Sequence, residues 1–196
     1  MKLKFKKGFD GDLSKLPTRE VEGSTIFREP ESIEKLSVMA NTIGLVLTIV
    51  AFVPLFIMGG GLRGILDNPY ASVQFLIGCI PPVVTMPIHE VLHALCFKEE
   101  VEFYTYLKKG LLFVVGTESM TKLRFVFMSM LPNIVFGFIP YILFLVFPSQ
   151  IWLGVWGAVC IGSGAGDYIN VFNAITQMPK GSRCYMSGHR TYWYMP

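Results

Sequence analysis

Two histidines and a glutamate stand close together in the segment His89-Glu90-Val91-Leu92-His93. A spacing of four residues places both imidazoles on one face of a helix. Such an HExxH pattern can bind zinc through two neutral imidazole nitrogens, which leaves coordination positions for a third protein ligand and a water. The Glu90 carboxylate beside the first histidine would take the proton of that water. These residues therefore predict a zinc-dependent hydrolytic site.

The surroundings of the motif strengthen this interpretation. The HExxH segment ends an apolar run that begins near Ala71 and has no charged residue between Asp67 and His89. Burying two histidines and a carboxylate there costs several kcal/mol unless something compensates them, and a metal ion would do so. The alternative is a group of helix-end side chains that reach the membrane interface without binding metal. The sequence leaves that alternative open.

A catalytic zinc site needs a third protein ligand, and Asp167 is the strongest candidate. It is the one acidic residue between Arg124 and Lys180. His89 and Asp167 are both expected roughly 25 Å along their predicted helices, near the cytoplasmic edge of the membrane. Asp167 could instead be a buried acid that pairs with Arg124 or a lysine. Three further residues could serve as the third ligand in its place, namely Glu118, His189 and Cys96.

Polar and small residues accompany Asp167. Three asparagines could either join helices by hydrogen bonds or contact the substrate or the zinc ligands; they are Asn133, Asn170 and Asn173. Three glycines just before the acid would let another helix approach closely, as a ligand shared between helices requires; they are Gly162, Gly164 and Gly166.

The elements that must position these residues are predicted to be membrane-spanning helices. The chain has 196 residues, of which 52% are hydrophobic and 16% charged, and its mean hydropathy is +0.50. This composition is too apolar for an ordinary soluble domain. Uncharged runs of about 20 residues predict four spans, at residues 38–58, 71–97, 125–147 and 151–175. The predicted fold class is an all-α membrane protein with four transmembrane helices and one small β-hairpin between spans two and three.

Lysine and arginine placement predicts the orientation of these spans. The N-terminal arm carries eight such residues, the link to the second span only Arg63, the loop 98–124 five, and the tail after residue 175 three. Positive charges favour the cytoplasmic side, so both termini are expected there. We therefore expect a cytoplasmic arm (1–36), a transmembrane zinc-metalloprotease-like domain (37–178) and a cytoplasmic tail (179–196). The net charge of +3 fits a lipid bilayer as partner and gives no indication of nucleic acid.

The loop after the zinc motif predicts the hairpin. Residues 101–107 and 111–117 favour strands, and Lys108-Lys109-Gly110 supplies a turn between them. An exposed strand edge beside a protease site can bind an extended substrate through main-chain hydrogen bonds. Phe113 and Val115 are therefore candidate substrate-binding residues, although a purely structural hairpin is an equal alternative.

These motifs together carry a resemblance. HExxH near the end of a membrane helix, the following hairpin, Leu131-Pro132-Asn133 and Gly166-Asp167 resemble the site-2 protease class of intramembrane metalloproteases. More closely, residues 35–178 resemble a bacterial family of small zincin peptidases with four spans. In site-2 proteases the third ligand is an aspartate in an Asp-Gly setting, so the resemblance implies Asp167. The chain departs from that pattern, because Tyr168 follows the aspartate and no proline precedes it.

The combined prediction is a zinc-dependent peptidase in the bacterial cell membrane. Its expected cofactor is zinc, and its expected substrates are membrane proteins or peptides cut near the cytoplasmic face. No PDZ-like or CBS-like regulatory domain is recognisable, so a membrane partner is a candidate regulator. Two rival functions keep the membrane fold without hydrolysis. One is a metal-binding scaffold, and the other is a small transporter whose Asp167 and histidines line a proton or ion path.

Overall fold

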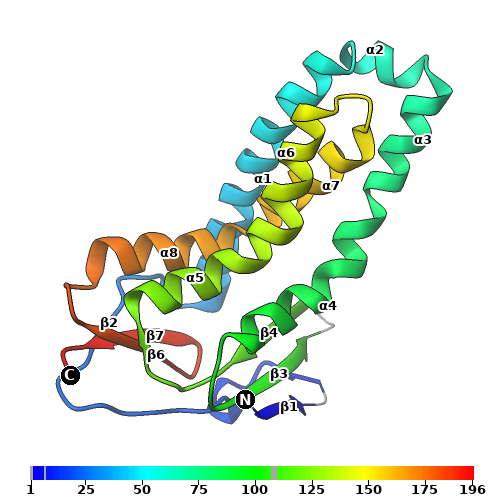
Figure 1. The fold of residues 1–196 in the computed structure, drawn as a ribbon. Coiled ribbons are helices and arrows are strands. Elements are labelled where there is room, and N and C mark those ends of the chain that lie inside the picture. Colours follow the sequence, from blue (N-terminus) through cyan, green and yellow to red (C-terminus); the bar gives the residue numbers. More distant parts are fainter. Residues whose placement is uncertain (1, 7, 107–109) are drawn as a thin grey trace. The chain divides into compact units, whose positions relative to one another are not determined.

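The computed structural model describes residues 2–6, 8–106 and 110–196 (Figure 1). The chain is mostly helical, and it divides into two compact units. Unit 1 comprises residues 1–36, 90–131 and 169–196, and unit 2 comprises residues 37–89 and 132–168. Helix α4 passes from unit 2 into unit 1 between His89 and Glu90.

The helices follow the apolar runs of the sequence. In chain order they are η1 (Leu13–Lys15), α1 (Ile33–Met58), α2 (Gly61–Leu66), α3 (Pro69–Gly78), α4 (Ile80–Leu95), α5 (Lys122–Asn133), the π-helical η3 (Ile134–Phe138), α6 (Ile139–Val146), α7 (Ile151–Ser163) and α8 (Ala165–Gln177). The switch to π-helix at η3 follows Pro132, whose ring cannot donate the usual backbone hydrogen bond.

Three helical segments are long and apolar enough to cross a membrane. They are Ile33–Met58, Pro69–Leu95 and Lys122–Val146, which correspond to the first three predicted spans. The predicted fourth span, 151–175, is divided instead. Helix α7 has 13 residues and ends at Ser163, Gly164 is its C-cap, and α8 follows. At 1.5 Å per residue α7 is about 20 Å long, shorter than the roughly 30 Å of membrane hydrocarbon.

Unit 2 is a group of closely packed helices. Its core contains Leu55, Phe144 and Val155, which are all almost fully buried. Gly154 is required in this packing, because an added Cβ would lie 2.7 Å from the Phe144 ring and 2.9 Å from Leu55. Many large apolar side chains on the outer helix faces are exposed, including Leu45, Ile49 and Val53 on α1. Such faces suit a lipid environment.

Unit 1 contains a three-stranded sheet with the order β1-β3-β4. Strand β1 (Lys2–Lys6) pairs in parallel with β3 (Glu100–Tyr106), which pairs antiparallel with β4 (Leu111–Val115). The two strands predicted after the zinc motif thus pair as neighbours, with Tyr106 opposite Leu111. In the predicted turn, residues 107–109 lie outside the described residues. Among the described strands, β4 forms one edge of this sheet.

A second sheet in unit 1 has the order β2-β7-β6-β5. Its strands are β2 (Thr25–Ile26), β5 (Met120–Thr121), β6 (Arg183–Ser187) and β7 (Arg190–Tyr194). The prediction of an all-α fold with one hairpin was therefore too simple. Strands β2 and β5 have two residues each and pair with distant parts of the chain, so local sequence patterns gave little sign of them.

The core of unit 1 joins segments from both ends of the chain. Phe27 of the N-terminal arm is fully buried and packs edge-on against Phe125 of α5, with ring centroids 6.3 Å apart. Met178 and Cys184 from the C-terminal part belong to the same core. The N-terminal arm is thus part of the folded unit 1.

Candidate metal centre

The three residues of the motif lie on the last turns of α4. Each of His89, Glu90 and His93 offers one ligand atom, and these atoms lie within 4.8 Å of one another. The chain therefore contains the local His-Glu-His group that the sequence predicted. His93 is buried, and the other two side chains are partly exposed.

His93 is oriented by the backbone of α5. Its Nδ1 lies 2.9 Å from the carbonyl oxygen of Met128, and both residues belong to unit 1. A carbonyl oxygen can only accept a hydrogen bond, so Nδ1 must carry the proton. The neutral ring then has its lone pair on Nε2, which is the form that binds a metal ion.

His89 lies beside the predicted third ligand. Its Nε2 is 3.2 Å from Oδ2 of Asp167, and both residues belong to unit 2. Only 21% of the His89 side chain and 13% of the Asp167 side chain are exposed. The structure thus brings together two residues that are 78 positions apart in the sequence.

Asn133 also contacts the Asp167 carboxylate. Its Nδ2 donates a 2.7 Å hydrogen bond to the same Oδ2 atom, and Asn133 is only 1% exposed. Gly164 makes room for this amide, because a Cβ at Gly164 would lie 1.6 Å from Oδ1 of Asn133. Of the roles considered for Asn133, the hydrogen bond between helices is therefore present, and it orients a candidate zinc ligand.

The described residues fit a zinc ion. Two ligand atoms at about 2.0–2.1 Å from zinc in tetrahedral geometry are roughly 3.3 Å apart. The 3.2 Å between His89 Nε2 and Asp167 Oδ2 agrees with that spacing. The donor set of imidazole nitrogens and a carboxylate oxygen is also typical of catalytic zinc. His89 and Asp167 are therefore spaced as two ligands of one zinc ion would be.

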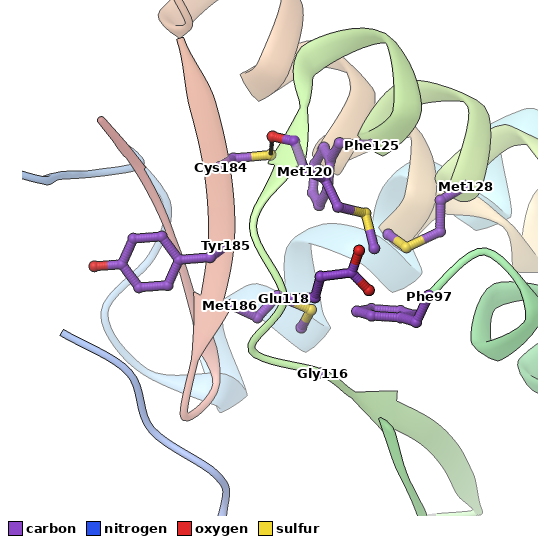
Figure 2. Close-up of a pocket in the computed structure, with 9 residues that line it drawn as sticks. All are labelled: Phe97, Gly116, Glu118, Met120, Phe125, Met128, Cys184, Tyr185 and Met186. Atoms are coloured by element: carbon purple, nitrogen blue, oxygen red, sulfur yellow. Dashed lines mark hydrogen bonds between the residues drawn. The ribbon is translucent and has the colours of Figure 1, made fainter. Parts of the chain in front are cut away.

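Glu118, a competing candidate for the third ligand, is engaged elsewhere. Its carboxylate pairs with the guanidinium of Arg124 and accepts hydrogen bonds from the backbone N–H groups of Lys98 and Glu99. Figure 2 shows it beside Phe97 and Met128 at a small cavity of about 10 Å³. Burial raises the pKa of Glu118, but the hydrogen bonds from Arg124 and the two backbone groups outweigh burial and hold its pKa below the ordinary value of 4.5.

His189 and Cys96, which could also have supplied the third ligand, make different contacts. His189 Nε2 lies 3.5 Å from the carbonyl oxygen of Glu31, and the thiol of Cys96 donates to the carbonyl of Leu92. Arg124, considered as a partner of Asp167, pairs with Glu118 instead.

The remaining candidate residues are distributed over unit 1. Asn173 is buried and accepts a 2.9 Å hydrogen bond from Gln177, which favours a structural role. Asn170 is half-buried on α8. Phe113 stacks on Tyr104 with ring centroids 5.2 Å apart, and Val115 is buried in the same cluster. The side chains of Phe113 and Val115 thus stabilise the sheet.

The glycine prediction holds at two of three positions. Gly162 lies against α1, where an added Cβ would be 2.7 Å from the Gly44 carbonyl oxygen, and Gly164 accommodates Asn133. Gly166 has open space around its Cβ position. The contact that sequence reasoning missed is the Met128 carbonyl, because a backbone acceptor leaves no signal in residue identity.

One comparison with known proteins gives a match. A family described as "Putative zincin peptidase" matches residues 82–183. That range covers half of the chain and contains His89, Glu90, His93, Asn133 and Asp167.

The chain belongs to this zincin peptidase family. Membership implies zinc as the cofactor and a metallopeptidase as the kind of enzyme, in agreement with the His-Glu-His group of α4. No curated protein and no solved structure matches the chain.

Proposed function

We propose that this zincin is a membrane-embedded peptidase of the site-2 protease type, in which His89, His93 and Asp167 hold zinc and Glu90 is the general base. The observation that carries the proposal is the 3.2 Å approach of Asp167 Oδ2 to His89 Nε2. It supplies the carboxylate ligand that an HExxH pair lacks. Because Asp167 comes from a separate helix, α8, helix assembly and metal binding would depend on each other.

The residues of the chain divide the chemical work among them. Bound zinc would lower the pKa of a water and polarise the scissile carbonyl. Glu90, beside His89, takes a proton from the attacking water and delivers it to the leaving amine. Asn133 keeps one Asp167 oxygen aimed at His89. The Met128 carbonyl keeps the His93 proton on Nδ1.

The sheets of unit 1 support a chain that crosses the membrane an even number of times. Strand β2 of the arm, β5 before α5 and the tail strands β6 and β7 belong to one hydrogen-bonded sheet. Strands of one sheet lie on one side of a bilayer, because unpaired strand edges are not tolerated in the hydrocarbon. The arm, the residues before α5 and the tail would therefore share a side.

This constraint favours four crossings. Helix α1 and the α3–α4 segment would provide the first two crossings. The α5–α6 segment leaves the sheet side, and only α7 with α8 can bring the chain back to β6. Arg63 is the one lysine or arginine of unit 2, and all others belong to the residues of unit 1. The positive-inside rule then places unit 1 and both termini in the cytoplasm, with a bacterial cell membrane as the expected location.

The proposed substrates are polypeptides at the cytoplasmic face of the membrane. Strand β4 supports this, because its edge position in the sheet leaves main-chain groups for an incoming extended chain. Phe113 and Val115 would act through this backbone, since their side chains pack within the sheet cluster. A regulatory membrane partner remains a prediction.

Zinc content and peptide hydrolysis of purified variants test the proposal together. Glu90→Gln keeps the side-chain shape but removes the proton acceptor, so zinc should stay near one per chain while hydrolysis falls about 100-fold or more. His89→Ala should lose both. Full hydrolysis by Glu90→Gln would contradict the peptidase, and zinc without hydrolysis in the unmodified chain would favour a metal-binding scaffold.

The transporter hypothesis makes a different prediction. If Asp167 carried protons along a path, Asp167→Asn would abolish ion flux into vesicles and leave zinc content unchanged. Under our proposal the same variant binds zinc more weakly.

A further inference from the structure

Arg124 and Glu118 form a partly buried network of hydrogen bonds at the end of the zinc-motif helix. Arg124 lies in the first turn of α5, and its Nε donates a 3.0 Å hydrogen bond to the carbonyl oxygen of Cys96. Nη2 of the same guanidinium donates to the same oxygen, and Nη1 donates to Glu118. Cys96 is the first residue after α4, so the network begins where that helix ends.

Glu118 continues the network into the next strand. It is 6% exposed and accepts hydrogen bonds from the backbone N–H groups of Lys98 and Glu99, the latter at 3.0 Å. These residues directly precede β3. A helix end leaves carbonyl groups without intrahelical partners, and a cation placed there also interacts favourably with the helix dipole. One ion pair therefore fixes both the end of α4 and the chain that leaves it.

Helix α5 makes a second contact with α4 one turn later. The Met128 carbonyl, which accepts from His93 Nδ1, lies four residues after Arg124 on the same helix. Four residues correspond to about one helical turn of 5.4 Å. Cys96 likewise lies about one turn from His93. The Arg124–Cys96 and Met128–His93 contacts can therefore form together only in one register of α5 against the end of α4. Arg124 thus determines where the Met128 carbonyl meets His93.

We propose that Arg124 and Glu118 are positioning residues that hold α5 against the end of α4 and thereby orient His93 for zinc. This inference rests on the proposed function, because it concerns one of the zinc ligands. The pair acts through the backbone of α5 and not through a contact of its own with the metal. Its loss would let the imidazole tilt away from the ligand geometry.

The chain offers a matched control for a merely structural ion pair. Arg190 and Glu29 also join distant segments within unit 1, with 21% and 6% of their side chains exposed. The corresponding values for Arg124 and Glu118 are 23% and 6%. Glu29 likewise accepts a backbone hydrogen bond, from Thr191 at 3.1 Å. The two pairs therefore have similar burial, but Arg124 is the arginine that contacts the end of the zinc-motif helix.

The test measures zinc affinity by competition with a chromogenic chelator, using the full chain in nanodiscs. We expect Arg124→Gln and Glu118→Gln to weaken zinc binding about tenfold, as is typical when support around a ligand is lost. Arg190→Gln should bind zinc as the unmodified chain does. Arg124→Lys should not restore affinity, because one ammonium cannot reproduce the planar set of donors.

A second readout needs no metal. Nitrogen NMR of His93 in the zinc-free protein reports which ring nitrogen carries the proton. The unmodified chain and Arg190→Gln should show the Nδ1–H form, and Arg124→Gln should show a mixture of both tautomers.

The possible results separate the two proposals. Wild-type affinity and an unmixed tautomer in Arg124→Gln would overturn the positioning role and leave the peptidase standing. Equal losses of affinity in Arg124→Gln and Arg190→Gln would also overturn it, because they would indicate general destabilisation. An unmodified chain that binds no zinc would overturn both proposals.

Discussion

The two histidines of the zinc motif are fixed by different kinds of group. His89 in unit 2 meets the side chain of Asp167, which Asn133 orients. His93 in unit 1 meets the backbone carbonyl of Met128. A side-chain partner can be removed by one substitution, whereas a backbone partner can only be moved by shifting its helix. Single substitutions should therefore affect the His89 side of the site more strongly than the His93 side.

The two units also differ in charge, and this difference predicts the orientation of the chain in the membrane. Labelling from outside cells would test that orientation. Exposed positions in the link regions of unit 2 should be extracellular, whereas exposed positions of unit 1 should be cytoplasmic. In a background without the native cysteines, Ser149→Cys should react fully with an impermeant maleimide. Glu22→Cys and Lys180→Cys should react only after the cells are opened. Labelling of Lys180→Cys in intact cells would exclude the proposed topology of four crossings with cytoplasmic termini.

Replacing Asp167 should have the largest effect on the metal. Asp167→Asn keeps the shape but replaces a charged oxygen ligand with a weak neutral one, so zinc affinity should fall on the order of 100-fold. Asp67→Asn is the matched control, because Asp67 is the other acidic residue of unit 2 and lies in the exposed link after α2. Chelator competition measures both variants. Equal affinities would remove Asp167 from the ligand set.

Two buried asparagines test whether the hydrogen bond from Asn133 to Asp167 supports zinc binding. Asn133→Leu removes the hydrogen bond to Asp167 at similar volume and should weaken zinc binding about 10-fold to 100-fold. Asn173→Leu removes a buried hydrogen bond to Gln177 in unit 1 and should lower thermal stability without changing the affinity of the folded protein. If both variants bind zinc alike, Asn133 has only a structural role.

Alanine substitutions at Gly164 and Gly166 should give a smaller difference in zinc affinity. Gly164→Ala would place a methyl group on the Asn133 amide and push it from Asp167, so zinc affinity should fall about tenfold. Gly166→Ala meets open space and should leave zinc binding unchanged, with a gain in stability of up to about 1 kcal/mol from helix propensity. Metal titration and thermal unfolding measure both variants. A lower zinc affinity in Gly166→Ala than in Gly164→Ala would contradict the close packing at Gly164.

The smallest expected effect concerns the ion pair of Glu118 with Arg124, whose contribution to the stability of the fold should depend on pH. The pKa of Glu118 is lowered in the folded chain, so its ionised form stabilises the fold fully above pH 4.5, and this contribution is lost as the pH falls below 4.5. Glu118→Gln should remove that acid sensitivity. Burial raises the pKa of Glu29, so its contribution to the stability of the fold has the opposite pH dependence. That contribution declines as the pH rises above 4.5. The free energies of unfolding of Glu118→Gln and Glu29→Gln, measured between about pH 3 and 6, distinguish these two pH dependences. Identical pH dependences for the two variants would contradict the assignment.

The sequence by itself identified the zincin motif and the helices that are apolar and long enough to cross a membrane. HExxH needs only local helical spacing to bring its side chains together, and uncharged runs of about 20 residues identify spans without any tertiary information. Asp167 could be singled out because an acid is rare in such a run. The strands after the motif were recognisable from their composition, since they pair with an immediate neighbour.

Tertiary structure decided how the residues are supported. The Met128 carbonyl, the fit of Gly164 around Asn133 and the engagement of Glu118 by Arg124 all depend on helices or strands meeting at one register. Residue identity does not encode that register, because backbone carbonyls are the same at every position. The sheet that joins arm, loop and tail was equally hard to foresee, since its two-residue strands form only where distant segments meet.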